Sequence, residues 1–258
     1  MADIRQGGEE DLQGRRAIVV GASRGFGKGV AEAFCAAGAS VLAVSRDGRA
    51  LAELTAVYPK LQTAVADAAD PSIPGQLLDR HQPDILALVA GASPLLRPIH
   101  HQTWDTFSLN WHSDVRIAFQ WVRETLLKPL RPGSTVIVMS SGAALAGSPL
   151  SGGYAGAKAT VRFITTYAQQ ESQRGGLEIT FKTVLPRLSP ATSLGRPAVA
   201  AYAARAGIPE EQFVSELGPA ATPQSVGAAF VRLASGSADG KAREFMLTGE
   251  GLVPLPPT

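Results

Sequence analysis

A tyrosine and a lysine stand four positions apart in the segment SGGYAGAKAT, residues 151–160. On a helix, positions i and i+4 share one face, so Tyr154 and Lys158 would project in the same direction. An unperturbed phenol has a pKa of about 10 and exchanges protons poorly at neutral pH, but a nearby ammonium favours the phenolate and lowers that pKa. The pair is therefore either an acid with the cation that tunes it or an exposed pair on an ordinary helix. The other motifs of the chain are needed to choose between these two interpretations.

A glycine-rich turn follows the first apolar run of the chain. Residues 15–21 form a short run with β-branched residues, and residues 27–38 have helical spacing that ends in a glycine suited to a C-cap. Gly21, Gly25 and Gly27 lie at this junction, where a strand–turn–helix unit lets phosphates approach backbone N–H groups. The turn therefore predicts a dinucleotide phosphate site, with a turn that merely needs glycines as the alternative.

Short apolar runs alternate with segments of helical periodicity along the chain. The runs that predict strands are residues 15–21, 40–45, 61–67, 84–91, 134–141, 177–186 and 244–249. The segments that predict helices are residues 27–38, 47–58, 71–81, 103–130, 152–172 and 222–235. Strands that are apolar throughout, each followed by a helix, imply a parallel sheet covered on both faces, with right-handed crossovers. We predict one α/β domain over residues 1–258, a doubly wound parallel sheet of about seven strands.

The segment at about residues 188–217 departs from this alternation. It is too long for a simple helix-to-strand connection, and excursions of this kind are often lids. Its text, SLGRPAVAAYAARAGIPEEQFVSEL over residues 193–217, predicts a mobile helical flap. The apolar content suggests a partly apolar substrate, or alternatively a subunit contact.

Composition narrows the class of protein. Apolar residues make up 45% of the 258 residues and charged residues 18%, which is enough to bury a large core. The net charge of +2 is spread along the chain, so we expect neither nucleic-acid nor membrane binding. The polar residues 1–16 lack the apolar core of a secretion signal, which favours a cytoplasmic protein. Cys35 has no partner for an intramolecular disulfide and is expected to be a buried helical thiol. The four histidines, including His100 and His101, lack a ligand-spaced set, so we expect no metal.

The glycine spacing and the tyrosine–lysine pair together resemble the short-chain dehydrogenase/reductase family. The turn reads Gly-x-x-x-Gly-x-Gly, and the resemblance extends from about Gly14 to Gly249, with four separate signals in the family's order. It implies a Rossmann-like fold and reversible hydride transfer between a nicotinamide and a carbonyl or secondary alcohol. In the reductive direction Tyr154 would protonate the oxygen, and Lys158 would also bind the nicotinamide ribose.

The resemblance adds a serine and an asparagine to the site. Ser141 ends a predicted strand at the carboxyl edge of the sheet, and by resemblance it orients and polarises the substrate carbonyl. Its neighbour Ser140 is rejected, because successive strand residues face opposite ways. Asn110 matches the helix asparagine that holds a water in the family's proton relay, with a plain surface asparagine as the alternative. The implied catalytic set is Asn110, Ser141, Tyr154 and Lys158.

The end of the second strand indicates which dinucleotide is preferred. Members of the family that prefer NAD carry an acidic residue there for the ribose 2′-hydroxyl, whereas this chain has Ser45 and then Arg46. A guanidinium pairs with a 2′-phosphate, and Arg24 in the glycine turn is the family's second basic position for it. NADP(H) is therefore favoured over NAD(H). Asp47 follows Arg46 and is an acidic residue that would argue against a 2′-phosphate, although it should begin the next helix, where an acid suits the helix dipole.

The resemblance extends to the remaining lining of the site. Asp67 matches the position that contacts the adenine, with a helix N-cap as the alternative. The residues assigned to the cofactor are Gly21, Ser23, Arg24, Gly25, Phe26, Gly27, Ser45, Arg46, Asp67, Ala68, Ala90, Gly91, Ala92, Tyr154, Lys158, Pro186, Leu188 and Thr192. Those assigned to the substrate are Ser93, Leu95, Ser141, Ala143, Leu150, Tyr154 and Leu194.

Two motifs depart from the family pattern. After the fourth strand the family carries Asn-Asn-Ala-Gly, and here Val89 and Ala90 replace both amides before Gly91. After the sixth strand a Pro-Gly is usual, and here Pro186 precedes Arg187. Neither change removes the Ser–Tyr–Lys set, but both leave room for a specialised substrate.

The leading hypothesis is an NADP(H)-dependent oxidoreductase of a partly apolar carbonyl or alcohol. The alternative is a catalytically weak regulatory or scaffold protein that kept the dinucleotide-binding fold. A sugar-nucleotide epimerase or dehydratase shares Tyr-x-x-x-Lys but ranks low on its glycine spacing. In the family the helices at residues 104–127 and 154–170 pair across subunits, so a homodimer or homotetramer is expected. The C-terminal residues 251–258 would reach a neighbouring subunit or trail off.

Overall fold

Eight strands form one sheet in the computed structural model, which describes residues 11–237 and 242–256. The sheet order is β3-β2-β1-β4-β5-β6-β7-β8. The strands are β1 (Arg16–Val20), β2 (Ser40–Ser45), β3 (Gln62–Val65), β4 (Ile85–Leu88), β5 (Thr135–Met139), β6 (Thr180–Pro186), β7 (Glu244–Thr248) and β8 (Gly251–Pro254). The strands up to β7 pair in parallel, and the order reverses between β1 and β4. This reversal is the switch point at which α/β folds bind ligands.

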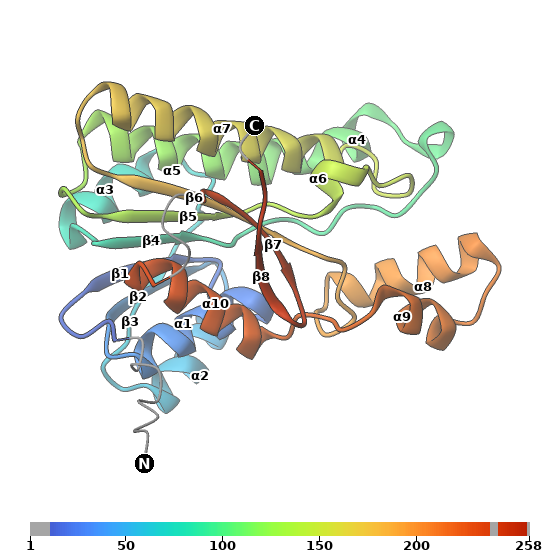
Figure 1. The fold of residues 1–258 in the computed structure, drawn as a ribbon, viewed down its shortest axis with the longest axis horizontal. Coiled ribbons are helices and arrows are strands. Elements are labelled where there is room, and N and C mark those ends of the chain that lie inside the picture. The colour runs from blue at the N-terminus through green and yellow to red at the C-terminus, as the bar shows by residue number, and fades with distance from the viewer. Residues whose placement is uncertain (1–10, 238–241, 257–258) are drawn as a thin grey trace, which may run out of the picture.

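The helices lie on both faces of the sheet (Figure 1). They are α1 (Gly25–Ala36), α2 (Gly48–Val57), α3 (Ser72–His81), α4 (Trp104–Asn110), α5 (Arg116–Leu127), α6 (Ala143–Ala146), α7 (Tyr154–Arg174), α8 (Gly195–Ala206), α9 (Glu210–Leu217) and α10 (Pro223–Ser235). A short 3₁₀ turn, η1 (Ile99–His101), precedes α4. The doubly wound α/β architecture expected from the sequence is confirmed.

Alternate residues of each central strand supply two different cores. In β1, Ala17 and Val19 belong to the core beneath α1, α2 and α10, whereas Ile18 and Val20 belong to the core beneath α3, α5 and α7. Successive side chains of a strand point to opposite faces, so a strand buried on both faces has to be apolar throughout. This is why the strand runs in the sequence are continuous rather than alternating.

The first and last helices of the chain pack closely against one face of the sheet. Phe34 of α1 and Phe230 of α10 are fully buried in the same core. A Cβ atom on Gly29 would lie 2.1 Å from the carbonyl oxygen of Pro223, so only glycine allows this approach. α10 begins at a capping box in which the Thr222 side chain accepts a hydrogen bond from the backbone N–H three residues later.

The sheet has one strand more than predicted, and the extra strand is antiparallel. Residues 251–254 form β8, which pairs with β7 through Thr248 and Gly251 at the hairpin end. The alternative that this segment trails off is wrong for residues 251–254, because the short run Gly-Leu-Val-Pro folds back onto its own sheet, and contact with a neighbouring subunit stays a prediction. Residues 257–258 of that segment lie outside the described residues.

The long helix predicted over residues 103–130 is divided in three. α4 ends at Asn110, a π-helical turn, η2, runs from Trp111 to Val115, and α5 follows and ends before Pro129. A π turn inserts an extra residue and redirects the side chains around it, and such turns are frequent at functional sites. Helical periodicity alone cannot reveal it.

The excursion forms the helical pair α8–α9, which extends beyond the sheet (Figure 1). Tyr202 of α8 stacks on Phe213 of α9, with ring centres 6.5 Å apart. The Tyr202 hydroxyl also accepts a hydrogen bond of 3.1 Å from the backbone N–H of Leu150. The helical character predicted for this segment is confirmed, and this contact attaches it to the loop before α7.

The part of the structure that is described does not include residues 1–10, to which the prediction about a secretion signal refers. Cys35 is half-buried in α1, where burial and then the charge of Glu32 raise the pKa of its thiol to about 11. It is therefore protonated at neutral pH, as expected of a structural thiol. None of the helices in the described ranges combines the length and the apolar character needed to cross a membrane.

Candidate active site

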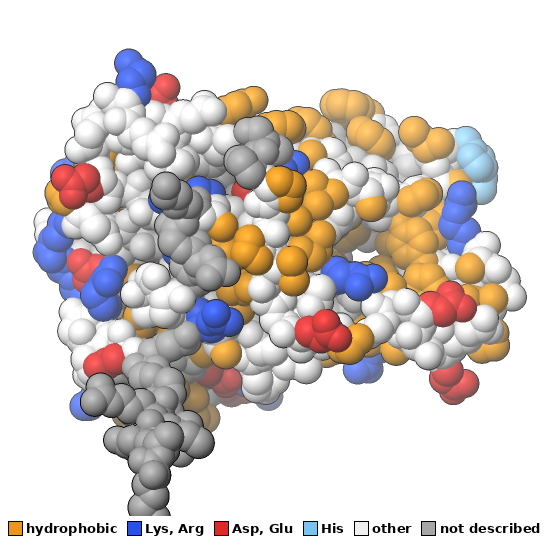
Figure 2. Space-filling view, in the orientation of Figure 1, with side chains coloured by type: hydrophobic (Ala, Val, Ile, Leu, Met, Phe, Trp, Pro, Cys, Tyr) orange, Lys and Arg blue, Asp and Glu red, His pale blue; other side chains and the backbone are white. Residues whose placement is uncertain are grey.

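A cleft of about 1000 Å³ opens at the carboxyl ends of the parallel strands. Figure 2 shows a hollow between the body of the domain and the α8–α9 pair, with hydrophobic side chains on its wall. The lining comes from the turns after β1, β2, β4, β5 and β6, from η2 and α7, and from the excursion. Segments distant in the sequence therefore meet at the carboxyl edge of the sheet, where the sequence analysis predicted the functional side chains.

The glycine turn after β1 has the shape of a phosphate cradle. A Cβ atom on Gly27 would lie 2.0 Å from the carbonyl oxygen of Gly21, so the turn folds tightly only with glycine. α1 begins at Gly25 without a side-chain cap and with no acidic residue in its first turn. Its N-terminal N–H groups and positive dipole end thus face the cleft, where a phosphate group would satisfy them. The residues present fit a dinucleotide.

The two serines at the end of β5 have different partners. The hydroxyl of Ser140 donates a 2.8 Å hydrogen bond to the carbonyl oxygen of Lys158, so it holds β5 to α7. The hydroxyl oxygen of Ser141 accepts a 3.2 Å hydrogen bond from the N–H of Ala143 and lines the cleft. With that N–H donating to it, the Ser141 hydroxyl can still donate its own proton to a substrate oxygen. The choice of Ser141 over Ser140 agrees with this arrangement.

The glycine pair before Tyr154 allows α7 to start against α4. A Cβ atom on Gly153 would lie 2.1 Å from the carbonyl oxygen of Phe107, whose oxygen accepts the Gly153 N–H. Tyr154 therefore opens α7 at the cleft wall, half-buried, and Lys158 lies one turn later with only 5% of its surface exposed. The Lys158 ammonium is 5.8 Å from the centre of the Tyr154 ring. The alternative of an exposed pair on an ordinary helix is wrong.

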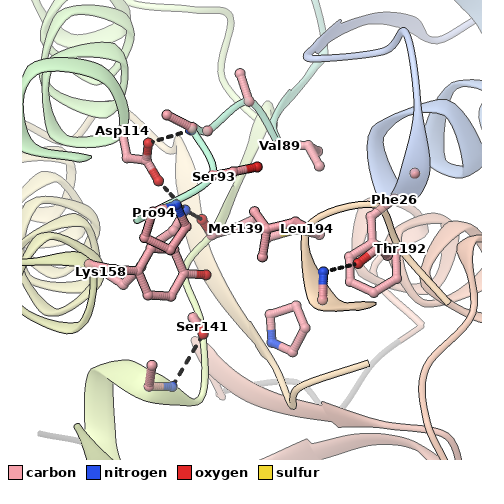
Figure 3. A pocket seen from close by; sticks show the side chains of 18 of the residues that line it. Phe26, Val89, Ser93, Pro94, Asp114, Met139, Ser141, Lys158, Thr192 and Leu194 are labelled. Carbon is pink, nitrogen blue, oxygen red and sulfur yellow. Dashed lines mark hydrogen bonds and ion pairs between the residues drawn. The ribbon is translucent and has the colours of Figure 1, made fainter. Parts of the chain in front are cut away.

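The ammonium of Lys158 has two further contacts, both visible in Figure 3. Its Nζ lies 3.0 Å from Oδ2 of Asp114 and donates a 3.3 Å hydrogen bond to the carbonyl oxygen of Met139. Desolvation opposes the charge on Lys158, but the nearby Asp114 carboxylate, the Tyr154 phenol and the hydrogen bond to Asp114 raise the lysine pKa above its ordinary value. Lys158 is therefore a buried cation at neutral pH.

Comparison with known proteins agrees with this geometry. The family model described as short chain dehydrogenase matches residues 15–203, which is most of the chain. The chain belongs to the short-chain dehydrogenase family. It is 29% identical over 182 residues to the L-xylulose reductase of Mesocricetus auratus, covering 69% of this chain and 68% of that protein. It is 33% identical over 138 residues to the D-erythrulose reductase of Gallus gallus, covering 51% and 56%. It is 29% identical over 133 residues to Carbonyl reductase [NADPH] 2 of Sus scrofa, covering 50% and 54%.

Family membership makes the chain an oxidoreductase that uses a nicotinamide dinucleotide. The residues that the sequence assigns to this cofactor all line the cleft, from Gly21 at the first turn to Thr192 in the excursion. So do Ser93, Ser141, Ala143, Tyr154 and Leu194 of the predicted substrate set. Figure 3 shows Ser93, Ser141 and Leu194 around one space in this short-chain dehydrogenase. Their contacts with bound molecules stay a prediction.

Three predicted residues lie outside the cleft lining. Leu95 is 40% exposed, and its neighbour Leu96 lines the cleft instead. Leu150 is buried behind the wall, where its backbone N–H is bonded to Tyr202. Asn110 is fully buried, and its side-chain amide donates a 2.7 Å hydrogen bond to the carbonyl oxygen of Ala92. The surface alternative for Asn110 is therefore wrong, and its amide holds the loop after β4.

Two aspartates that follow β2 and β3 accept hydrogen bonds from nearby backbone N–H groups. Asp47 caps α2 by accepting a 3.0 Å hydrogen bond from the N–H of Ala50, as expected. Asp67 accepts one from the N–H of Ala69, and α3 begins only at Ser72. The helix N-cap alternative for Asp67 is wrong, and its carboxylate lines the cleft.

The residues of the cleft lining that sequence reasoning missed include Asp114, Arg116, Tyr202 and Phe213. Asp114 had a usable signal, because a carboxylate one turn after Asn110 is costly on a buried helix face. The aromatic pair had none, since only the folded excursion brings the two rings together. The backbone N–H groups of Val89 and Ala90 both donate to the carbonyl oxygen of Val20, which fastens this loop without the amides usual in the family.

No three His, Cys, Asp or Glu side chains in the described part of the chain are grouped as metal ligands.

Proposed function

We propose that the chain is an NADP(H)-dependent reductase that interconverts a carbonyl group and a secondary alcohol. The observation that carries this proposal is the meeting of Ser141, Tyr154 and a buried, charged Lys158 in one cleft with the glycine turn. NADP(H) rather than NAD(H) is supported by Arg24 and Arg46, which are exposed in the cleft near the end of β2.

The coenzyme supplies or accepts the hydride. Ser141 donates a hydrogen bond to the substrate oxygen and orients it, and Tyr154 exchanges a proton with that oxygen. Lys158 has three N–H donors, of which Asp114 and Met139 receive two. The third is available for a ribose hydroxyl, so one residue serves both coenzyme binding and proton exchange.

The wall of the cleft favours a substrate with an apolar part. Leu145, Leu194, Pro197 and Phe213 contribute to the end formed by α6 and the excursion. Two of the relatives named above are reductases of xylulose and of erythrulose, which are small polyhydroxy ketones. We propose a ketone that carries a larger apolar group than these sugars, because binding is favoured when apolar lining and an apolar group are removed from water together.

A panel of ketones tests the proposed function. NADPH oxidation is followed with L-xylulose, erythrulose, cyclic ketones and aryl ketones, and each is repeated with NADH. We expect turnover with NADPH, highest for a substrate with a ring or alkyl group beside the carbonyl. Tight NADPH binding without turnover on any ketone would favour the regulatory or scaffold alternative. Absence of binding to either coenzyme would contradict the proposal altogether.

We also propose that the protein acts as a homodimer or homotetramer in the cytoplasm. Phe119 of α5 and the stacked Phe163 and Tyr167 of α7 are 54%, 44% and 57% exposed on the outer helical layer. Aromatic rings gathered on one helical face are costly to leave in water.

Light scattering tests this assembly. The native protein should have two or four times the mass of one subunit. Phe163→Glu should lower this mass to that of a monomer or a dimer. The control Val57→Glu on α2 should leave the mass unchanged. A monomeric native protein would contradict the assembly without touching the proposed reaction.

A further inference from the structure

Asp114 is a buried acid in the cleft that the proposed reaction does not use. It lies on the π turn η2 and is 2% exposed. Its Oδ1 accepts hydrogen bonds of 2.8 Å from the N–H of Ala92 and 2.7 Å from the hydroxyl of Ser113. Its Oδ2 faces the ammonium of Lys158 at 3.0 Å, as Figure 3 shows. A buried carboxylate is costly unless its oxygens have partners; here Oδ1 accepts hydrogen bonds, whereas Oδ2 has no hydrogen-bond donor among the described residues and is balanced only by the ion pair with the Lys158 ammonium.

The surrounding loop is shaped to admit this carboxylate. A Cβ atom on Gly91 would lie 2.7 Å from Oδ2 of Asp114, so the space beside the ammonium exists only because residue 91 is glycine. Asn110 donates to the carbonyl oxygen of Ala92 and, at 3.3 Å, to Oδ1 of Asp114. Asp114 therefore joins the loop after β4, the π turn and α7 around the nitrogen of Lys158.

The ion pair fixes the net charge at the reacting phenol. With the Asp114 carboxylate present, the charges of Asp114 and Lys158 cancel, and loss of the Tyr154 proton leaves one buried negative charge. With a neutral side chain at position 114, loss of the same proton turns a buried positive charge into a neutral pair. Burying net charge is unfavourable, so the carboxylate makes the phenol harder to deprotonate.

The other charged and titratable groups of the cleft wall are unchanged by a substitution at position 114. On the elements that pack around α7 and η2, the described titratable and charged residues that line the cleft are His112, Arg116 and Arg187. The strand β5 and the short helix α6 contribute none. A comparison of variants at position 114 therefore isolates the effect of this carboxylate.

We propose that Asp114 is a positioning residue that anchors the ammonium of Lys158 and cancels its charge, so that Tyr154 exchanges its proton in a site without net positive charge. This proposal rests on the proposed reaction for its purpose. It extends the Ser–Tyr–Lys set by a fourth group that acts through the lysine.

The first experiment needs neither coenzyme nor turnover. The ultraviolet absorbance of phenolate is titrated in the coenzyme-free protein and in Asp114→Asn, and Tyr154→Phe versions of both identify the Tyr154 signal. We expect the Tyr154 midpoint to fall by about one to three pH units in Asp114→Asn, the range for a neighbouring charge. A midpoint that stays or rises would overturn the proposal. A wild-type protein that reduces no ketone would contradict the proposed reaction and leave this titration interpretable.

The second experiment separates positioning from a merely structural role. In Asp114→Asn the pH midpoint of kcat should fall in both reaction directions, whereas Asp105→Asn, an exposed acid on α4, should keep it. Loss of stability with a lower kcat at every pH and an unmoved midpoint would assign Asp114 a structural role only.

If Asp114→Asn does not fold, the variant Asp114→Glu tests the positioning role instead. It keeps the charge but moves it by one methylene, so the midpoint should stay while kcat falls. A wild-type kcat in Asp114→Glu would overturn the positioning role.

Discussion

Tyr154→Phe is expected to lower kcat by about 100- to 10,000-fold while leaving NADPH binding nearly unchanged. This is the usual contribution of a positioned general acid or base, and the substitution removes only the hydroxyl. The phenyl ring keeps the volume of the side chain, and Lys158 keeps its contacts with Asp114 and Met139. Stopped-flow turnover gives kcat, and quenching of protein fluorescence by NADPH gives the dissociation constant.

The matched control lies on the same helix. Tyr167→Phe removes a hydroxyl from an exposed ring outside the cleft, so its turnover should equal that of the native protein. Undiminished turnover in Tyr154→Phe would remove the proposed proton exchange. Equal losses in both variants would point to a fault in α7 rather than to chemistry.

Arg46→Asp is expected to weaken NADPH binding by about 10- to 150-fold and NADH binding by a few-fold at most. A hydrogen bond to a charged group contributes about 1.5–3 kcal/mol, and the substitution adds repulsion between a carboxylate and a phosphate. Among the described residues, no carboxylate lies within ion-pair distance of Arg24 or Arg46. Both guanidinium groups are thus available to a phosphate.

Arg49→Asp is the control for the charge change. Arg49 stands three residues later on α2, is 91% exposed and pairs with Glu53 at 3.4 Å, outside the cleft lining. It changes the net charge by the same amount, so it reports the long-range part of the effect. Equal losses of NADPH and NADH affinity in Arg46→Asp would remove the case for recognition of the 2′-phosphate.

The fold followed from the sequence because its signals are local and repeated. Each central strand is buried on both faces, so its run of apolar residues is continuous, and each run is followed by a helical period. The glycine turn was readable for a similar reason, since Gly27 is required by a backbone contact within the turn itself. Ser141 could be chosen over Ser140 because strand residues alternate between faces.

The rest depends on contacts between distant segments. The partner of Lys158 is Asp114, 44 residues earlier in the numbering, and only the π turn directs that carboxylate toward α7. The Tyr202–Phe213 stack depends on how α8 and α9 meet. Asn110 was placed at the reaction by resemblance, whereas its amide is held by Ala92 because the loop after β4 passes directly beside it.

The close approach of Gly29 to Pro223 has a consequence for biosynthesis. The helix that carries the phosphate cradle leaves the ribosome before its packing partner, which follows nearly 200 residues later (Gly29 to Pro223). The nucleotide-binding half is thus unable to complete its interior until the residues of α10 have been translated, and a chain that stops before them would leave α1 with an uncovered apolar side.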